Sequence, residues 1–479
     1  MKNLQPQGLW SNFHSLTQIP RPSGKKEEIS AFLAEYGRSL GLETIVDSIG
    51  NVIIRKPASA GYENHPGVIL QGHMDMVPQK NNDTIFDFEK DPIQAYIDGE
   101  WVTAKGTTLG ADNGIGVAAA MAILADKSVV HPPLEVLITV DEETGLYGAF
   151  ALEGGVLQGK TLLNLDSESE GELYVGCAGG VDITAKLAYT LVEVEEGDVA
   201  LKVSITGCKG GHSGCDIHLQ RANANKLLFR FLKDAVANLE ARLASVEGGS
   251  LRNAIPREAS AIITVPAEGV DEIMDLVAEY EDLFVAEYNG IEDAIRFTAT
   301  EVECPATELP EDVQDFLIHA ITACPNGVYR VIPERPDVVE TSNNLAMLTT
   351  EDNCITVSCL TRSSVESRKE ELQEIIHSAF AMAGAEVEFS GSYPGWQPNF
   401  NSNILEVMKT TYQTNYGVEP QVIIIHAGLE CGIIGRNYPG MDMISFGPTI
   451  QHPHSPDERV NIASVAKFYD YLLATLKAL

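Results

Sequence analysis

The residues best suited to chemistry are histidines and carboxylates that follow apolar stretches of the chain. The clearest case is His73, which comes directly after an apolar run at residues 68–70 and a short Gln-Gly step, with Asp75 two residues later. Imidazole is a good metal ligand, and a nearby carboxylate can fix the orientation of its ring. The pair indicates a metal site at the end of a strand, although a lone histidine there is more often an ordinary core or surface residue.

Four further segments carry clustered acids or histidines. Such segments can meet, because the carboxyl ends of strands in an open α/β sheet converge on one crevice. Two histidines and three carboxylates would suit a pair of zinc-like cations, which can activate water and polarise a carbonyl group. The pattern therefore indicates a metal-dependent hydrolase. The four segments are Gly110-Ala111-Asp112-Asn113-Gly114, Val140-Asp141-Glu142-Glu143-Thr144-Gly145, Asn164-Leu165-Asp166-Ser167-Glu168 and Gln451-His452-Pro453-His454-Ser455-Pro456-Asp457-Glu458.

Each segment also has an ordinary explanation. Asp112 lies near glycines, where aspartate commonly forms a turn or caps a helix, and Glu142-Glu143 could be a solvated loop. Consecutive carboxylates after Asp141 would nevertheless be costly in a cleft without a cation. Asp166 closes an apolar strand, where an unpaired carboxylate is also unfavourable. The coincidence at several strand ends favours one shared site.

Alternating strands and helices are expected to position this site. Strands are predicted around 44–54, 67–71, 134–140 and 161–165, with helices over 29–40 and 117–125. Because the strands are continuously apolar, the fold class is α/β, with a mixed, mostly parallel sheet that has helices on both faces.

The pattern changes in the middle of the chain. From about residue 181, alternating strands and amphipathic helices form two α+β sets of similar make-up, as a duplication would produce, and one long helix is predicted over 222–243. Apolar strands return at 422–425 and 443–446. We therefore predict a catalytic domain over 1–182 and 393–479, interrupted by an inserted lid or substrate domain over 183–392.

Composition limits the classes of function. The chain has 479 residues, which favours more than one domain, and its net charge of −35 leaves no basic surplus for nucleic acid or anionic membranes. Its eight cysteines include no CxxC pair, which is typical of reduced thiols. No stretch approaches 18 apolar residues, and the first residues lack the apolar core of a signal peptide, so we expect a cytoplasmic protein.

Several long motifs are specific enough to indicate a family. They are Ile19-Pro20-Arg21-Pro22-Ser23-Gly24, Gly106-Thr107-Thr108-Leu109-Gly110-Ala111-Asp112-Asn113-Gly114-Ile115-Gly116, Lys209-Gly210-Gly211-His212-Ser213-Gly214, His426-Ala427-Gly428-Leu429-Glu430-Cys431-Gly432 and His454-Ser455-Pro456-Asp457-Glu458. They resemble the dinuclear zinc aminoacylase/carboxypeptidase/dipeptidase family nearly end to end. The resemblance is closest to its aminoacyl-histidine dipeptidases (Xaa-His dipeptidase, peptidase D).

The resemblance implies two divalent metal ions, zinc in the first place, with Co²⁺ or Mn²⁺ able to substitute. His73 and Asp166 would hold one ion, Glu143 and His454 would hold the other, and Asp112 would bridge them. The five ligand assignments follow from the motifs of the family alone.

Two details of the ligand set depend on the branch of the family. Many members have a second acid after the bridging aspartate, whereas this chain has Asn113, as in the dipeptidase branch, and a cis peptide bond is expected between Asp112 and Asn113. His452 is a rival to His454 as a ligand, and the family motif favours His454.

The resemblance also implies the other roles at the site. Glu142 would be the general base, and Asp75 would orient the ring of His73. His212 would stabilise the oxyanion, while Asn253 and Arg362 would bind substrate, with Arg362 suited to a free carboxylate. His212 and Arg362 could also be an ordinary turn histidine and a surface cation. If the inserted domain contacts substrate, catalysis needs closure of the two domains.

The expected activity is hydrolysis of dipeptides of the Xaa-His type, such as β-alanyl-histidine, and of other unblocked dipeptides, by a homodimer. One alternative is a tripeptidase, a carboxypeptidase or an N-acyl amino acid deacylase with the same metal core. Another is a non-catalytic metal-binding homologue, against which the presence of Glu142 argues. A purely structural zinc protein is disfavoured, because structural zinc sites are typically cysteine-rich and closed.

Overall fold

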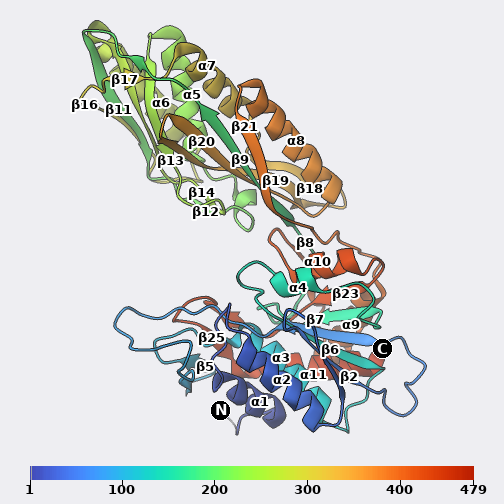
Figure 1. Cartoon of the computed structure of the whole chain (residues 1–479). Helices are drawn as coiled ribbons and strands as arrows, with labels where there is room; N and C mark the ends of the chain where they lie inside the picture. The colour runs from blue at the N-terminus through green and yellow to red at the C-terminus, as the bar shows by residue number, and fades with distance from the viewer. Residues whose placement is uncertain (2) are drawn as a thin grey trace. The chain divides into compact units, whose positions relative to one another are not determined.

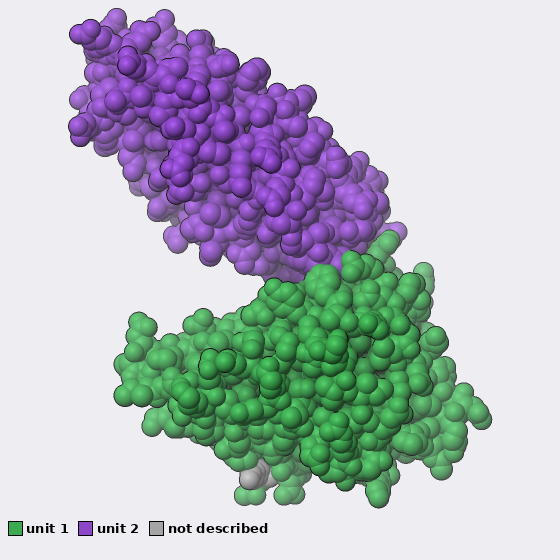
Figure 2. All heavy atoms as spheres, viewed as in Figure 1, with its two compact units in different colours: residues 1–177, 396–424, 429–479 green, residues 178–395, 425–428 purple. Residues whose placement is uncertain are grey.

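The chain forms two compact units, which are described separately below. The computed structural model describes Met1 and residues 3–479. Unit 1 comprises residues 1–177, 396–424 and 429–479, and unit 2 comprises residues 178–395 and 425–428 (Figure 2). Unit 2 is thus an insertion that interrupts unit 1 in the sequence.

Unit 1 is built on a mixed sheet with helices on both faces (Figure 1). The strand order is β1-β2-β6-β3-β7-β23-β8-β22, and β6, β3, β7 and β23 run parallel to one another. The strands are β1 Glu43–Val46, β2 Val52–Lys56, β3 Val68–His73, β6 Leu134–Thr139, β7 Thr161–Asn164, β8 Glu172–Cys177, β22 Gln421–Ile425 and β23 Asp442–Ser445. The helices are α1 Gln7–Thr17, α2 Glu27–Ser39, α3 Ala111–Ala125, α4 Tyr147–Ala151, α9 Asn403–Tyr416, α10 Glu430–Asn437 and α11 Ile462–Ala478.

The central strands are buried on both sides, which explains their continuous apolar sequences. Every residue of β3 and of β6 is buried. Side chains of consecutive strand residues point to opposite faces, so a strand covered on both faces must be apolar throughout. The predicted α/β class with a mostly parallel sheet is confirmed. A smaller antiparallel sheet lies beside it, in the order β24 Ile450–Gln451, β25 Arg459–Asn461, β5 Trp101–Ala104 and β4 Ala95–Asp98.

Unit 2 contains two halves that share one topology. The long sheet has the order β16-β11-β15-β13-β19-β20-β9-β21, and its strand pairs are antiparallel. The first half follows the chain as β11-α5-β13-β15-α6-β16, and the second follows it as β9-α7-β19-β20-α8-β21. In each half the first strand lies between the third and the fourth, which is the arrangement a duplication would give.

The elements of unit 2 are mostly strands. The strands are β9 Gly179–Ala188, β10 Val192–Glu193, β11 Asp198–Thr206, β12 Gly211–His212, β13 Arg242–Gly248, β14 Ala254–Ile255, β15 Ala259–Pro266, β16 Arg296–Val302, β17 Thr307–Glu308, β18 Gly327–Ile332, β19 Arg335–Glu351, β20 Cys354–Ser363 and β21 Glu386–Tyr393. The helices are α5 Ala224–Asn238, α6 Val270–Glu287, α7 Glu311–Ala323 and α8 Glu366–Met382.

Two of the predicted elements are wrong in extent. The strand predicted over 44–54 is the hairpin of β1 and β2, because Asp47 Oδ1 accepts the N–H groups of Ile49, Gly50 and Asn51 and so forms a tight turn. The helix predicted over 222–243 ends at Asn238, and β13 begins at Arg242. Pairing with β15 in the core of unit 2 outweighs the helical pattern there.

Two expectations concern the chain as a whole. The cysteines in the described part of the chain are all free thiols, as predicted. Among the described residues, no helix is both long enough and apolar enough to span a bilayer.

Candidate metal centre

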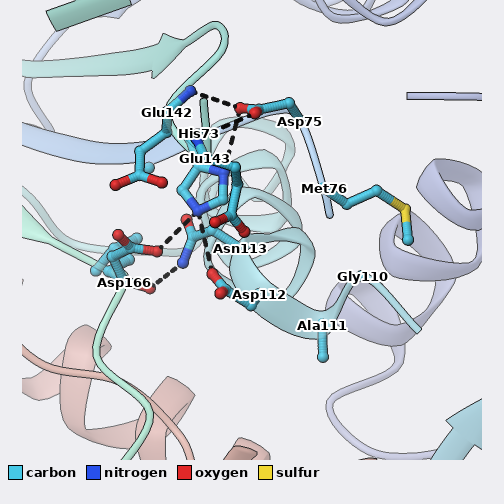
Figure 3. Close-up of polar contacts among 12 residues, drawn as sticks. His73, Asp75, Met76, Gly110, Ala111, Asp112, Asn113, Glu142, Glu143 and Asp166 are labelled. Atoms are coloured by element: carbon cyan, nitrogen blue, oxygen red, sulfur yellow. Dashed lines mark hydrogen bonds and ion pairs between the residues drawn. The ribbon is translucent and has the colours of Figure 1, made fainter. Parts of the chain in front are cut away.

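Three neighbouring strands of unit 1 deliver acids and a histidine to the same edge of the sheet. β3 ends at His73, β6 is followed by Glu142 and Glu143, and β7 is followed by Asp166. Because β6, β3 and β7 are adjacent and parallel, these positions meet beyond their carboxyl ends (Figure 3).

Asp112 lies between two groups, each made of one histidine and one further carboxylate. Its Oδ1 is 3.1 Å from His73 Nε2, which is also 3.2 Å from Asp166 Oδ1. Its Oδ2 is 3.2 Å from His454 Nε2, which is also 3.0 Å from Glu143 Oε2. The structure therefore brings together the five residues expected as ligands, with one oxygen of Asp112 in each group. His452 and His454 are both exposed, and it is His454 that forms ion pairs with Asp112 and Glu143.

The local backbone around Asp112 is arranged for close approach to β3. A Cβ atom at Gly72 would lie only 2.1 Å from Asn113 Oδ1, so only glycine fits there. Asn113 Nδ2 donates to Leu165 O over 2.7 Å, which ties the start of α3 to the residue before Asp166. The Asp112–Asn113 peptide bond is cis, as expected.

Glu458 fixes the first turn of α3 from the far end of the sequence. Its carboxylate accepts the N–H groups of Leu109, Gly110 and Ala111 at 2.7–2.9 Å and that of Asp112 at 3.3 Å. These donors have no partner within the helix, and an anion at a helix N-terminus is favourable. Glu458 follows His454 by four residues. The same loop therefore carries one candidate ligand, His454, and binds the start of the helix that carries another, Asp112.

The charges of the cluster fit divalent cations. Although burial opposes it, the carboxylates of Asp166, Asp112 and Asp75 raise the pKa of His73 well above its usual range. Hydrogen bonds with Asp112 and Glu143 raise the pKa of His454 to about 11. Glu143 Oε1 is buried and accepts no hydrogen bond among the described residues. Buried carboxylates of this kind are costly unless a cation neutralises them, and imidazole and carboxylate are the ligands that Zn²⁺, Co²⁺ and Mn²⁺ accept.

Metal binding should stabilise unit 1. Adding Zn²⁺ to chelator-treated protein at about 100 times its dissociation constant should contribute about 2.7 kcal/mol per site to the free energy of unfolding. Calorimetric melting curves with and without the metal would measure this change. In His73→Ala the stabilisation should shrink, and an identical melting temperature with and without metal in the wild type would contradict the metal site.

Asp75 makes more contacts than its expected one with His73. Its Oδ1 is 3.4 Å from His73 Nδ1, which is long for a hydrogen bond. Its two carboxylate oxygens also accept the backbone N–H groups of Glu142 (3.0 Å) and Glu143 (3.3 Å) (Figure 3). Asp75 is therefore placed to hold the loop of Glu142 as well as the ring of His73.

Glu142 has the environment of a proton acceptor. Its carboxylate extends toward the same space beside the His73 ring as that of Asp166 (Figure 3). Burial, reinforced by the nearby carboxylates of Asp166, Glu430 and Glu143, raises the pKa of Glu142 well above its usual range. A raised pKa suits a group that must accept and then return a proton near neutral pH.

A layer of polar side chains lies one step below the cluster on the same strands. Gln71 precedes His73 by two residues and therefore faces the same side of the sheet. Gln71 and Thr139 both donate to the fully buried carboxylate of Glu430, and Asn164 Nδ2 donates to Gln71 Oε1. These bonds link β6, β3 and β7 directly beneath the positions where the acids and histidine emerge.

Unit 2 brings together the three residues expected to contact substrate. His212 on β12 lies opposite Ala254 on β14, and Ser213 N donates to Asn253 O over 2.8 Å. Arg362 Nε is 3.4 Å from Ser213 Oγ. His212 Nδ1 accepts the N–H groups of Gly214 and Cys215 at 3.2 and 2.9 Å, so the neutral ring carries its proton on Nε2. Burial, with Arg362 nearby, lowers the pKa of His212 and favours this neutral form.

Sequence reasoning assigned no role to three buried residues around the cluster. They are Arg21, Glu430 and Glu458, which are 2%, 0% and 2% exposed. Each lies in one of the motifs that carry the family resemblance, and these motifs are the one feature of the sequence that points to them. Their partners are distant in the sequence, so spacing alone could not identify them.

The fold agrees with comparisons to known proteins. A model of peptidase family M20/M25/M40 matches residues 69–478, and the chain belongs to this family. The chain is 48% identical to the cytosol non-specific dipeptidase of Escherichia coli (strain K12) over 477 residues, which cover 100% of this chain and 98% of the relative. The expected family is confirmed.

Solved structures agree with this assignment. The aminoacylhistidine dipeptidase from Vibrio alginolyticus superposes with a TM-score of 0.96 at 49% identity, covering 100% of this chain and 98% of that one. The aminopeptidase PepT from Bacillus cereus ATCC 10987 has a TM-score of 0.58 at 17% identity over 99% of each chain. This second likeness is one of fold alone.

Proposed function

We propose that the protein is a metal-dependent dipeptidase that hydrolyses unblocked dipeptides, those with a carboxyl-terminal histidine among them. The observation that carries the proposal is the placement of Asp112, whose two oxygens each face a different histidine paired with a further carboxylate. Identity of nearly half over the full length to proteins named as dipeptidases supports the substrate class.

In this proposal His73 and Asp166 would hold one ion, Glu143 and His454 would hold the other, and Asp112 would be shared by both. When bound, two divalent ions, Zn²⁺ or in its place Co²⁺ or Mn²⁺, would polarise the peptide carbonyl and lower the pKa of a water molecule.

The chain's own residues would move the proton and bind the substrate. Glu142 accepts a proton from the attacking water as the C–O bond forms, and it donates that proton to the peptide nitrogen as the C–N bond breaks. The protonated Nε2 of His212 would donate to the developing oxyanion, and Arg362 would bind the free carboxylate of the dipeptide, with Asn253 as a further contact. The products are two free amino acids. Unit 1 would be the catalytic domain and unit 2 the inserted substrate domain.

A metal analysis coupled to a substrate panel tests the proposal. The panel contains Ala-His, Ala-Leu, a tripeptide and an N-acetyl amino acid. We expect two ions per chain and turnover of both dipeptides. Preference for the tripeptide or the N-acetyl amino acid would indicate a sibling hydrolase, and turnover of none by metal-loaded protein would indicate a non-catalytic homologue.

Arg362 should determine recognition of the free carboxylate. Arg362→Lys keeps the charge but loses the planar pair of donors, so KM for Ala-His should rise by about 10- to 100-fold, as expected for loss of a charged hydrogen bond. The wild type should favour Ala-His over its carboxyl-terminal amide, and the variant should lose that preference. Arg368→Lys on the surface of α8 is the matched control, and an unchanged preference in Arg362→Lys would remove Arg362 from the substrate site.

We also propose a cytoplasmic homodimer. The cytoplasmic location is supported by the free cysteines and by the name of the relative, a cytosol dipeptidase. The dimer is supported by the family resemblance. Analytical ultracentrifugation would measure the mass in solution, and a sedimenting species of a single chain would contradict the dimer.

A further inference from the structure

The motif Ile19-Pro20-Arg21-Pro22-Ser23-Gly24 has no part in the chemistry above, yet its arginine is buried beside the metal cluster. Arg21 is 2% exposed, and the acids that act on its charge are Glu458, Asp75, Asp112 and Glu143. A buried guanidinium is costly unless its donors are used, so its partners should reveal its role.

The guanidinium of Arg21 joins two segments that carry candidate metal ligands. Nη1 donates to Met74 O and to Asp75 O, each over 3.0 Å, and Nη2 donates to Gly110 O over 2.5 Å. Met74 directly follows His73, and Gly110 precedes Asp112 by two residues. One rigid side chain thereby spans the end of β3 and the start of α3.

Two glycines leave room for the guanidinium of Arg21. A Cβ atom at Gly110 would lie 2.5 Å from Arg21 Nη2, and one at Gly114 would lie 2.7 Å from the same atom. Gly110 also has a φ of +70°, which favours glycine. The sequence therefore has glycine at both positions where a side chain would collide with the guanidinium of Arg21.

The residues after Arg21 extend the contact to the loop of the proposed base. Ser23 Oγ donates to Asp75 Oδ2 over 2.7 Å, and Gly24 N donates to Asp141 Oδ1 over 2.7 Å. Asp75 in turn accepts the N–H groups of Glu142 and Glu143. The segment 21–24 thus contacts the end of β3, the start of α3 and, through Asp75 and Asp141, the loop of Glu142.

We propose that Arg21 is a positioning residue of the metal centre. It sets the spacing between His73 and Asp112 and, through Asp75, the place of the Glu142 loop. The proposal rests on the proposed metal centre. It concerns geometry rather than charge, because a lysine ammonium would keep the charge but could not donate in one plane to carbonyl groups on two segments.

The test compares Arg21→Lys and Arg21→Met with the wild type. We expect both variants to bind Zn²⁺ about 10- to 100-fold more weakly in competition with a chromophoric chelator. The visible absorption of the Co²⁺-loaded protein should change, and kcat for Ala-His should fall while KM stays near the wild-type value. Arg55→Met is the matched control, because Arg55 also donates to a backbone carbonyl and to acids in unit 1, at the opposite end of β6, and should leave Zn²⁺ affinity unchanged.

The outcomes separate this proposal from the proposed function. Variants that bind both ions with wild-type affinity and an unchanged Co²⁺ spectrum, even if less stable, would show a merely structural role. If neither variant folds, Ser23→Ala decides, since it removes one hydroxyl contact to Asp75 and should still shift the Co²⁺ spectrum; an unshifted spectrum would overturn the proposal. A wild type that binds no metal pair would overturn the proposed function and this inference together.

Discussion

Replacing Glu142 with glutamine should leave two metal ions bound and lower kcat for Ala-His by about 10²- to 10⁴-fold, the usual contribution of general acid–base catalysis. An amide of the same shape cannot accept the proton of the attacking water or return it to the leaving nitrogen. The carboxylate of Glu142 lies beside the candidate ligands (Figure 3) and is not needed as one, because Glu143 lies 3.0 Å from His454. KM should therefore change much less than kcat.

Glu168→Gln is the matched control for this result. Burial, with Asp112 and Asp166 nearby, raises the pKa of Glu168 to about 9. Glu168 has no place in the proposed proton transfer, so an amide of the same shape should lower kcat much less there than at Glu142. Metal analysis and steady-state kinetics on both variants distinguish the two half-buried glutamates. Retained turnover in Glu142→Gln together with its loss in Glu168→Gln would transfer the role of base to Glu168.

The parts of the structure that could be predicted from the sequence are those with a local signal. An apolar run that ends in a polar residue specifies both a buried strand and the position of its end, and β3, β6 and β7 each have this pattern. Parallel packing then brings His73, Glu143 and Asp166 to one edge. Which histidine and which acids would be ligands came from the motifs, and that assignment stays a prediction.

The residues that hold this edge in place have no such signal. Glu458 contacts the N–H of Leu109 across 349 positions of sequence, and Glu430 accepts from Gln71 across 359. Nothing in the local periodicity of either segment indicates those contacts, because they arise only when the chain returns to unit 1 after the insertion. Such a buried acid can be recognised only in the folded structure, where the groups that donate hydrogen bonds to it lie beside it.

The internal repeat of unit 2 is not visible as two consecutive stretches of sequence, for a related reason. In its second half the first strand, β9, is separated from α7 by the whole of the first half. The two sets therefore share strand order without being two consecutive stretches of sequence. The helix predicted over 222–243 failed similarly, since Leu243 and Val246 are buried as members of a strand paired with β15.

Asp112→Asn should have the largest effect on metal content. Each oxygen of Asp112 lies beside a different histidine. The asparagine side chain has one oxygen and an NH₂ group, and the NH₂ group cannot be a metal ligand. We expect fewer than two ions per chain after gel filtration, and turnover below that of Glu142→Gln, because water without a metal returns toward its bulk pKa of about 15.7 from about 7.

Comparison with Asp166→Asn separates a shared ligand from an unshared one. Asp166 contacts His73 but not His454, so its loss should weaken one ion and leave the Glu143–His454 group able to bind the other. Glu135→Gln, which removes a buried carboxylate at the start of β6, should retain both ions and controls for a general loss of acidic charge. Two ions bound with wild-type affinity by Asp112→Asn would show that Asp112 is not shared, and equal metal loss in Asp112→Asn and Asp166→Asn would show that the two groups do not bind independently.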